Sequence, residues 1–186
     1  MLEGRIVNLR AREMADLERN TRWVNDREVM RFMSVRYPMS ALAEEQRMRD
    51  RMVRPMTFAD TPLAIETKDG EHIGNTSLFN VSPEDRTADF GIMIGEKACW
   101  SKGYGSDATR TLLRFAFDEM NLHRVWLTVL ATHERGIACY RRCGFREEAR
   151  LRQDVYRHGQ YYDFITMGIL RNEFEALHGA EGGSDA

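Results

Sequence analysis

The fold is decided by the segment Trp100-Ser-Lys-Gly103-Tyr-Gly105-Ser-Asp-Ala108. It follows a run typical of a β-strand, residues 89–94, and precedes a run typical of a helix, residues 108–120. Glycine takes positive φ at no steric cost and leaves room for a ligand, so Gly103 and Gly105 predict a turn whose N–H groups converge at the helix N-terminus. Because such a cradle binds pyrophosphate, the segment predicts a cofactor that contains a diphosphate.

Composition excludes several classes of protein. A chain of 186 residues with 42% hydrophobic content can form one domain with a sizeable core but is too short for two of usual size. The net charge of −2 and the pI near 6.2 give no global field for nucleic acid or an anionic membrane. With no apolar run of about 18 residues and no secretory signal, we expect a cytoplasmic protein that binds neither.

Cysteine usage indicates a reducing compartment and no metal site. The chain has three cysteines, too few for a disulfide framework. Cys139 and Cys143 share one face of a predicted helix, but no His or second Cys pair stands at zinc-finger spacing. We expect both to be small core residues.

Periodicity predicts an alternation of helices and strands. Strands are expected at residues 4–9, 57–68, 72–80, 87–95, 124–130, 145–151 and 160–169. Helices are expected at residues 12–25, 26–33, 40–53, 108–120 and 134–143. Asp69-Gly70 and His158-Gly159 are turn signals, and the three strands before the glycine turn read as an antiparallel meander. We expect one domain over residues 1–177 and a disordered tail over residues 178–186.

In its second half the chain resembles the GNAT superfamily of acyl-CoA-dependent N-acetyltransferases. The order there is strand, glycine turn, helix, strand, a helix ending in Tyr140-Arg-Arg-Cys-Gly144-Phe145, strand and strand. Asn25-Asp-Arg-Glu-Val-Met-Arg-Phe32, Ala88-Asp-Phe-Gly91 and Tyr156-Arg-His-Gly-Gln-Tyr161 are similar to the branch that holds the ribosomal-protein N-terminal and spermidine N-acetyltransferases. The resemblance implies an α+β (mixed α/β) fold: a central, mostly antiparallel twisted sheet of about seven strands, with a splayed parallel pair, flanked by helices.

The resemblance also implies acetyl-CoA as co-substrate, held first at its pyrophosphate. The family signature Gln/Arg-x-x-Gly-x-Gly/Ala aligns with the glycine segment, with Trp100 where Gln or Arg is expected. Backbone amides rather than the first side chain would hold the pyrophosphate, helped by the helix dipole. These amides belong to Lys102, Gly103, Tyr104, Gly105 and Ser106, and the side chains of Lys102 and Arg110 would add positive charge.

Two further cofactor contacts follow from the family. Its helix motif Asn-x-x-Ala/Ser-x-x-x-Tyr aligns with residues 133–140, so His133 replaces Asn and Gly136 replaces Ala; a helix-start or surface histidine is the alternative role for His133. The strand through Ile92, Met93 and Ile94 would splay from its neighbour so that the pantetheine arm lies in the gap like an added strand. We expect Gly91 to ease a bulge there.

Acetyl transfer to an amine requires a proton acceptor, stabilisation of the carbonyl oxygen and protonation of the leaving thiolate. Asp89 is the candidate acceptor, and facing solvent or pairing with Arg86 is its structural alternative. The family implies that backbone donors of residues 91–94 stabilise the charge that develops in a tetrahedral intermediate. Tyr140 holds the family's place for the acid, with a packed core tyrosine as the alternative.

Two other functions fit parts of the sequence. Gly103-Tyr-Gly105-Ser-Asp-Ala108 also matches the G-x-G-x-x-G/A pattern of dinucleotide-dependent oxidoreductases, but an antiparallel meander precedes it and residues 123–131 contain no acid for the ribose. A catalytically silent acyl-CoA-binding module would keep the cradle and leave Asp89 and Tyr140 as bystanders.

The amine acceptor stays open among a protein N-terminal α-amine, an amino sugar and a small-molecule amine. Polyamine acetyltransferases need acids around a cationic substrate, and Ser34-Val-Arg-Tyr-Pro38 supplies none. Residues 30–56 hold six of the eleven methionines, which would suit an adaptable acceptor pocket or ordinary helix packing. A homodimer is compatible with the resemblance.

Overall fold

The computed structural model describes residues 1–33, 38–52 and 60–178. The strands are β1 (Leu2–Glu3), β2 (Val7–Ala11), β3 (Asp60–Thr67), β4 (His72–Ser82), β5 (Thr87–Ile94), β6 (Arg124–Leu130), β7 (Arg146–Arg157) and β8 (Gln160–Leu170). The α-helices are α1 (Leu17–Asn25), α2 (Ala41–Met52), α3 (Tyr104–Arg114), α4 (Glu134–Arg142) and α5 (Arg171–His178). Short 3₁₀ helices are η1 (Met14–Asp16), η2 (Val29–Phe32) and η3 (Lys97–Cys99), and η4 (Phe115–Glu119) is a π-helical continuation of α3. In this described part of the chain, no helix is long and apolar enough to cross a membrane.

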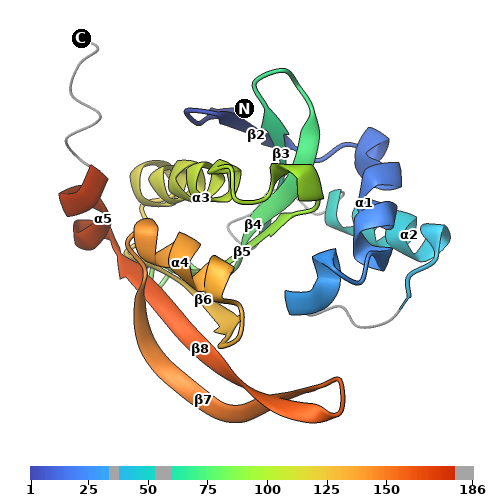
Figure 1. The fold of residues 1–186 in the computed structure, drawn as a ribbon. Coiled ribbons are helices and arrows are strands. Elements are labelled where there is room, and N and C mark those ends of the chain that lie inside the picture. The colour runs from blue at the N-terminus through green and yellow to red at the C-terminus, as the bar shows by residue number, and fades with distance from the viewer. Residues whose placement is uncertain (34–37, 53–59, 179–186) are drawn as a thin grey trace.

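The described strands form one sheet in the order β1-β2-β3-β4-β5-β6-β8-β7. All neighbouring strands are antiparallel except β5 and β6, which are parallel. The predicted α+β fold is therefore confirmed, with one strand more than expected, because β1 has only two residues and no periodic pattern. Figure 1 shows the twisted sheet running from the N-terminal strands at the top to the long β7–β8 hairpin below.

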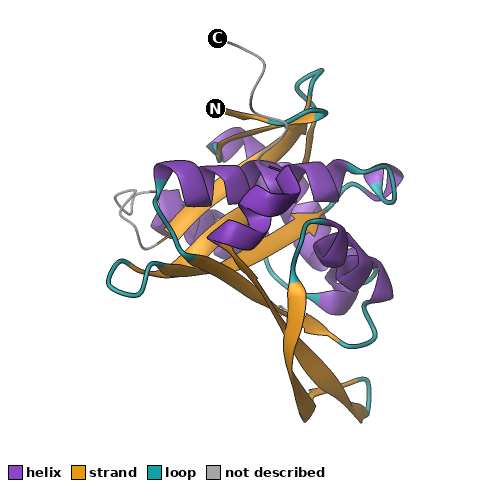
Figure 2. Cartoon of the chain, turned by 90° about the vertical axis from the view of Figure 1, so that its left-hand side faces the viewer, coloured by secondary structure: helices purple, strands orange, loops and turns teal. Residues whose placement is uncertain are grey.

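The β7–β8 hairpin is longer than predicted. The expected first strand ended at residue 151, whereas β7 continues to Arg157 through an irregularity between Leu151 and Val155, where Gln153 has a φ of 53°. Because nearly every side chain of β7 is exposed, its sequence carries no alternating apolar pattern. His158 and Gly159, with φ of 48° and 81°, make the predicted turn, and Figure 2 shows the hairpin extending beyond the helices.

The helices differ from prediction mainly at their ends. The helix expected at residues 26–33 is only the 3₁₀ turn η2, and α5 was not predicted because its apolar pattern spans barely two turns. The α3 helix begins at Tyr104, four residues before the predicted start, because only Gly103 of the two glycines lies outside it. Parts of four predicted segments lie outside the described residues: residues 34–37 of the loop, residue 53 of the helix, residues 57–59 of the strand and residues 179–186 of the tail.

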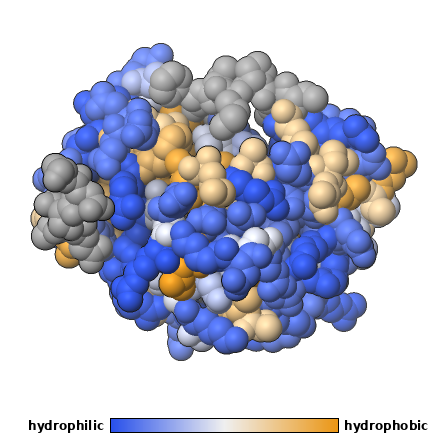
Figure 3. All heavy atoms as spheres, turned by 90° about the horizontal axis from the view of Figure 1, so that it is seen from above, coloured by the Kyte–Doolittle hydropathy of each residue, from blue (hydrophilic) through white to orange (hydrophobic). Residues whose placement is uncertain are grey.

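Buried contacts hold α3 over the sheet beside α4 (Figure 1). The buried Asp107 of α3 accepts hydrogen bonds from the backbone N–H groups of Ile6 (2.7 Å) and Val7 (3.1 Å), which ties the helix to the start of β2. Leu112 and Phe117 are fully buried in the same hydrophobic core. Seen from above, the outer face is largely hydrophilic with separate hydrophobic groups (Figure 3).

Candidate active site

The parallel strands β5 and β6 separate after a short paired segment. Residues 87–89 of β5 pair with residues 124–126 of β6, and the last such pair is Asp89 with Trp126. Beyond it β5 runs on to Ile94 and β6 to Leu130 without pairing to each other. The predicted splay of the parallel pair is present.

Gly91 does not form the expected bulge. The register of β5 against β4 is regular from Asp89 to Ile94, and the irregularity lies between Phe79 and Ser82 of β4, where Asn80 has a φ of 50°. A Cβ on Gly91 would lie 3.2 Å from the Phe79 ring, so the glycine gives space to that ring. The splay therefore needs no bulge in β5.

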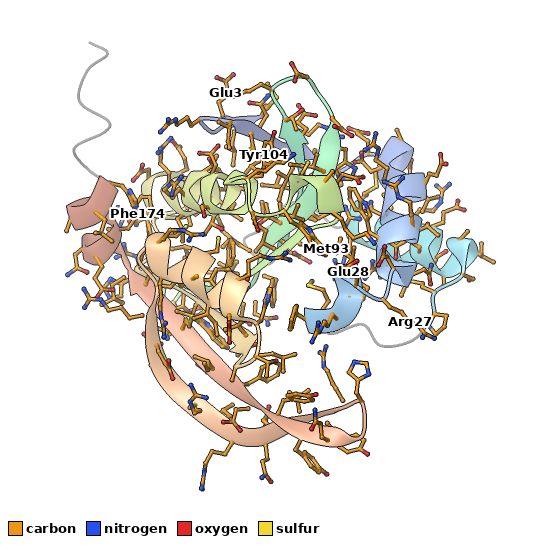
Figure 4. The ribbon with its side chains drawn as sticks, viewed as in Figure 1. Glu3, Arg27, Glu28, Met93, Tyr104 and Phe174 are labelled. Atoms are coloured by element: carbon orange, nitrogen blue, oxygen red, sulfur yellow. The ribbon has the colours of Figure 1, made fainter. Side chains whose placement is uncertain are left out.

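Two cavities meet at this opening. The strand cavity, of about 450 Å³, is lined mainly by residues of β4, β5, β6 and the N-terminal helices; Asp89 of β5 and Tyr140 of α4 are among its lining residues. The helix cavity, of about 330 Å³, lies at the N-terminus of α3 and along α4. Both are lined by Phe32, Met33, Ile92, Met93, His133 and Tyr140. Figure 4 shows Met93 near the centre of the molecule, with Glu28, another lining residue of the helix cavity, close by.

The glycine turn forms the floor of the helix cavity. Ser101 and Gly103 have φ of 60° and 90°, and Gly103 is the N-cap of α3. The first intrahelical bond runs from the Asp107 N–H to the Gly103 carbonyl at 3.0 Å, so the amides of residues 102–106 precede it. Free amides at a helix N-terminus can receive an anion, as the sequence predicted.

Gly105 serves this cradle through its size alone. It lies inside α3 without positive φ, so the expectation of a left-handed conformation is wrong for this residue. A Cβ there would lie 3.8 Å from Cys139 Sγ and from Ile94 Cγ1. Any larger side chain would extend into the helix cavity.

The structure brings together most of the predicted cofactor residues. Those that line the helix cavity are Ile92, Met93, Ile94, Gly103, Gly105, Ser106 and His133. Lys102, Tyr104 and Arg110 are not among its lining residues, and Tyr104 packs against the core (Figure 4). Arg135 and Arg142 of α4 line the cavity instead.

Trp100 supports one of these arginines. Its indole Nε1 donates a hydrogen bond to the Ile94 carbonyl at 2.7 Å, and the guanidinium of Arg135 lies 4.2 Å from its ring centroid. A cation over an indole face is held by the ring quadrupole. The residue that departs from the family signature thus positions a positive charge at the mouth of the cavity.

Cys139 was expected in the core, but it lines the helix cavity; Cys143 is buried as predicted. The Sγ of Cys139 lies 3.2 Å from Ser106 Oγ. The neighbouring Cys143 thiol, and then the Ser106 hydroxyl, lower the pKa of the Cys139 thiol below its usual value, against an opposing effect of burial. The Cys139 thiol therefore lies beside the cradle.

His133 and Gly136 form a matched pair. The His133 ring stacks on Phe32 with centroids 4.0 Å apart, and a Cβ on Gly136 would lie 2.4 Å from His133 Cδ2. The two departures from the family motif therefore depend on each other, because the larger side chain needs the smaller neighbour. Burial lowers the pKa of His133 to about 4, so the ring is neutral at pH 7.

Tyr140 stands where the two cavities join. Its ring makes edge contacts with Phe90 and Phe145, at centroid distances of 6.2 Å and 6.0 Å. Its hydroxyl makes no hydrogen bond to any described residue. Burial raises the pKa of the phenol, which keeps it protonated at neutral pH.

Asp89 shares the strand cavity with Tyr140. Asn80 Nδ2 donates a hydrogen bond to its carboxylate at 2.9 Å. Arg86, the alternative partner, instead donates to the Asn121 carbonyl and side chain, each at 2.7 Å. Burial raises the pKa of Asp89, which makes it a better proton acceptor than an exposed aspartate.

The strand cavity also contains residues that the sequence did not single out. Arg12, Arg47 and Arg51 line it. Of the methionine-rich stretch, Met30 and Met33 line it, whereas Met48 is buried. No group of three or more His, Cys, Asp or Glu side chains within the described ranges is placed to hold a metal ion.

Curated relatives are bacterial N-acetyltransferases. The chain is 28% identical over 176 residues to the spermidine N(1)-acetyltransferase of Escherichia coli K12, which covers 95% of this chain and 92% of that protein. It is 34% identical over 107 residues to the putative ribosomal N-acetyltransferase of Bacillus subtilis, which covers 58% of each. Both similarities lie in the branch that the sequence motifs indicated.

Solved structures agree with the sequence comparison. The spermidine N-acetyltransferase of Vibrio cholerae in complex with CoA and spermine superposes with a TM-score of 0.81 at 26% identity, over 90% of this chain and 97% of that one. A family model described as an acetyltransferase (GNAT) domain matches residues 7–146.

Proposed function

The chain belongs to the GNAT acetyltransferase family, and on this premise we propose how its residues move an acetyl group from acetyl-CoA to a primary amine. Membership makes the protein an acetyl-CoA-dependent N-acetyltransferase. The single observation that carries the proposal is the junction of the two cavities at Tyr140, with Asp89 in one of them. An amine and a thioester that entered from opposite sides would meet there.

The helix cavity has the chemistry to bind acetyl-CoA. The free amides of residues 102–106 would hold the pyrophosphate, and Arg135 and Arg142 would add charge. The open edge of β5 at Ile92, Met93 and Ile94 would accept the pantetheine amides as an added strand. Backbone N–H groups of residues 91–94 would also stabilise the carbonyl oxygen as charge develops on it.

Asp89 would receive the proton that the amine must lose. Amines with a pKa of about 8–10 are mostly protonated at neutral pH, so attack needs a proton acceptor, directly or through water. Asp89 lines the strand cavity, and Asn80 fixes its carboxylate. Its raised pKa favours proton uptake.

Tyr140 would protonate the thiolate that leaves. The hydroxyl has no hydrogen-bond partner among the described residues, so it is free to donate toward the sulfur. Neutral His133, stacked on Phe32, would form the wall between the reacting groups and solvent. These roles describe direct transfer, with no covalent enzyme intermediate.

The acceptor we propose is a primary amine: a protein N-terminal α-amine, an amino sugar or a small-molecule amine. The curated relatives are named for spermidine and for ribosomal proteins. We also propose a cytoplasmic, single-domain enzyme with a homodimer as its compatible assembly.

The test is a screen of amines and N-terminal peptides with acetyl-CoA, which measures free CoA thiol and the mass of each amine. We expect thiol release that depends on the amine and an equal amount of acetylated product. Tight binding of acetyl-CoA without thiol release from any amine would favour the silent binding module instead.

A further inference from the structure

The strand cavity has a strongly cationic wall. Arg12 follows β2, and Arg47 and Arg51 lie on α2; all three line the cavity. The only carboxylate among the described lining residues is Asp89, which we have assigned to the amine proton. The three arginines take no part in the proton transfers of the proposed reaction.

Arg12 is a buried cation with unused hydrogen-bonding capacity. Its side chain is only 7% exposed, and its buried Nε has no hydrogen-bond partner among the described residues. The nearest carboxylate oxygen, Glu44 Oε1, lies 4.0 Å from Arg12 Nη2, beyond hydrogen-bond distance. An anion in the cavity would therefore meet a guanidinium that has no carboxylate within hydrogen-bond distance, and hydrogen bonds between charged groups are stronger than neutral ones.

The carboxylate of Glu44 already pairs with another arginine. Arg47 donates two hydrogen bonds to its fully buried carboxylate, at 2.7 Å and 2.8 Å. Arg51 is exposed and forms no ion pair with a described residue. The guanidinium groups of Arg12 and Arg47 therefore outnumber the one carboxylate of Glu44, and Arg51 adds a third positive charge to the wall of the cavity.

The charges of the three arginines also act on one another. Burial lowers the pKa of Arg12 and the positive charges of Arg51 and Arg47 lower it further, while the carboxylates of Glu44 and Asp16 oppose this effect. An anion placed among them would relieve this repulsion. A second ammonium group would increase it.

We infer that the acceptor carries an anionic group, a carboxylate or a phosphate, in addition to its amine, and that Arg12, Arg47 and Arg51 hold this group in the strand cavity. The inference rests on the proposed function, in which the amine of the same molecule faces Asp89 and Tyr140. It separates this chain from relatives named for spermidine, because a polyamine carries only positive charges and would be repelled.

The experiment compares acceptors that differ only in the anion. Aminoalkyl carboxylates and aminoalkyl phosphates of increasing chain length are assayed against alkylamines of the same lengths, whose amine pKa values are similar, and against spermidine. We expect kcat/KM for the best amine that carries an anion to exceed that of the alkylamine of the same length about 10- to 100-fold, the range for one charge-assisted hydrogen bond. The carboxylate and phosphate series tell the two anions apart.

Variants locate the effect. The ratio of kcat/KM for the amine that carries an anion to kcat/KM for the alkylamine should fall about tenfold or more in Arg12→Gln and in Arg51→Gln. Because Arg51 is exposed, its variant tests the inference even if Arg12→Gln fails to fold. Arg49→Gln, on the same helix but paired with Glu45 and outside the cavity, should keep the ratio of the unchanged protein. The inference would be overturned if alkylamines or spermidine gave the same kcat/KM as the amines that carry an anion. It would also be overturned if the ratio of these kcat/KM values were the same in all variants.

Binding separates this inference from the proposed function. Calorimetry with an aminoalkyl carboxylate should show affinity that falls in Arg51→Gln. Such binding without turnover of any amine would retain the anion site and remove the proposed transferase roles. Turnover without preference for an anion would do the reverse.

Discussion

Tyr140→Phe separates a catalytic hydroxyl from a structural one. The ring contacts with Phe90 and Phe145 remain in this variant, and the removed hydroxyl has no hydrogen bond to a described residue. The loss of about 1 kcal/mol expected for a broken hydrogen bond therefore does not apply. We expect the free energy of unfolding to change by less than about 0.5 kcal/mol.

Catalysis should respond very differently. Loss of a general acid lowers kcat by about 10²–10⁴, or about 3–5 kcal/mol in activation free energy. The acetyl-CoA Kd should barely change, because the phenol acts only when the thiolate leaves. The assay measures kcat, the acetyl-CoA Kd and the melting temperature of Tyr140→Phe beside Tyr161→Phe, an exposed tyrosine of β8 outside both cavities. Near-normal turnover of Tyr140→Phe would refute the general-acid role.

Four further substitutions and one pH profile of the unchanged protein test the site. Asp89→Asn should lose activity about 10²–10⁴-fold near neutral pH and recover as the pH approaches the amine pKa, where the amine loses its proton unaided; a deficit that is constant in a pH–rate profile would contradict the base role. In the unchanged protein, activity should fall as the pH drops through the raised pKa of Asp89, because only the ionised carboxylate accepts a proton. Gly105→Val should fold, since Gly105 has ordinary helical φ, but calorimetry should show at least about tenfold weaker acetyl-CoA binding; native affinity would remove the pyrophosphate assignment. Gly136→Ala should destabilise the protein while His133 is present, because the added methyl group would collide with the histidine ring. In a His133→Asn background, where only helix propensity acts, the same substitution should stabilise the protein by about 0.5–1 kcal/mol. If Gly136→Ala changed the melting temperature in the same direction in both backgrounds, the two residues would not be a matched pair.

Local patterns predicted the frame of this fold well. Strand β6 was placed at its observed bounds, and the Asp69-Gly70 turn holds its predicted place, because β-branched runs and φ-positive turn residues act over a few positions. The parallel pairing of β5 and β6 came from the family resemblance, since no local pattern encodes it. The sequence did not predict the full length of β7 or the helix α5, because few side chains of either element are buried and burial produces the periodic apolar pattern.

The site was predictable where one segment builds it and not where distant segments meet. The cradle at Gly103 is contiguous, so its turn could be anticipated. Arg12 and Arg51 come together only because β2 and α2 pack beside the same cavity, and no spacing in the sequence relates them. Cys139 reads as a core residue on its helix, and only the approach of Ser106 from α3 reveals its place in the helix cavity.

The central claim is direct transfer between the two cavities, and an intact-mass measurement tests it most directly. The enzyme is mixed with stoichiometric acetyl-CoA, first without and then with an accepted amine, and the masses of protein and amine are recorded. The account predicts an unmodified protein in both samples and an acetylated amine that forms in step with free CoA thiol. An acetyl group that appears on the protein at Cys139 without amine, and moves to the amine when it is added, would contradict it.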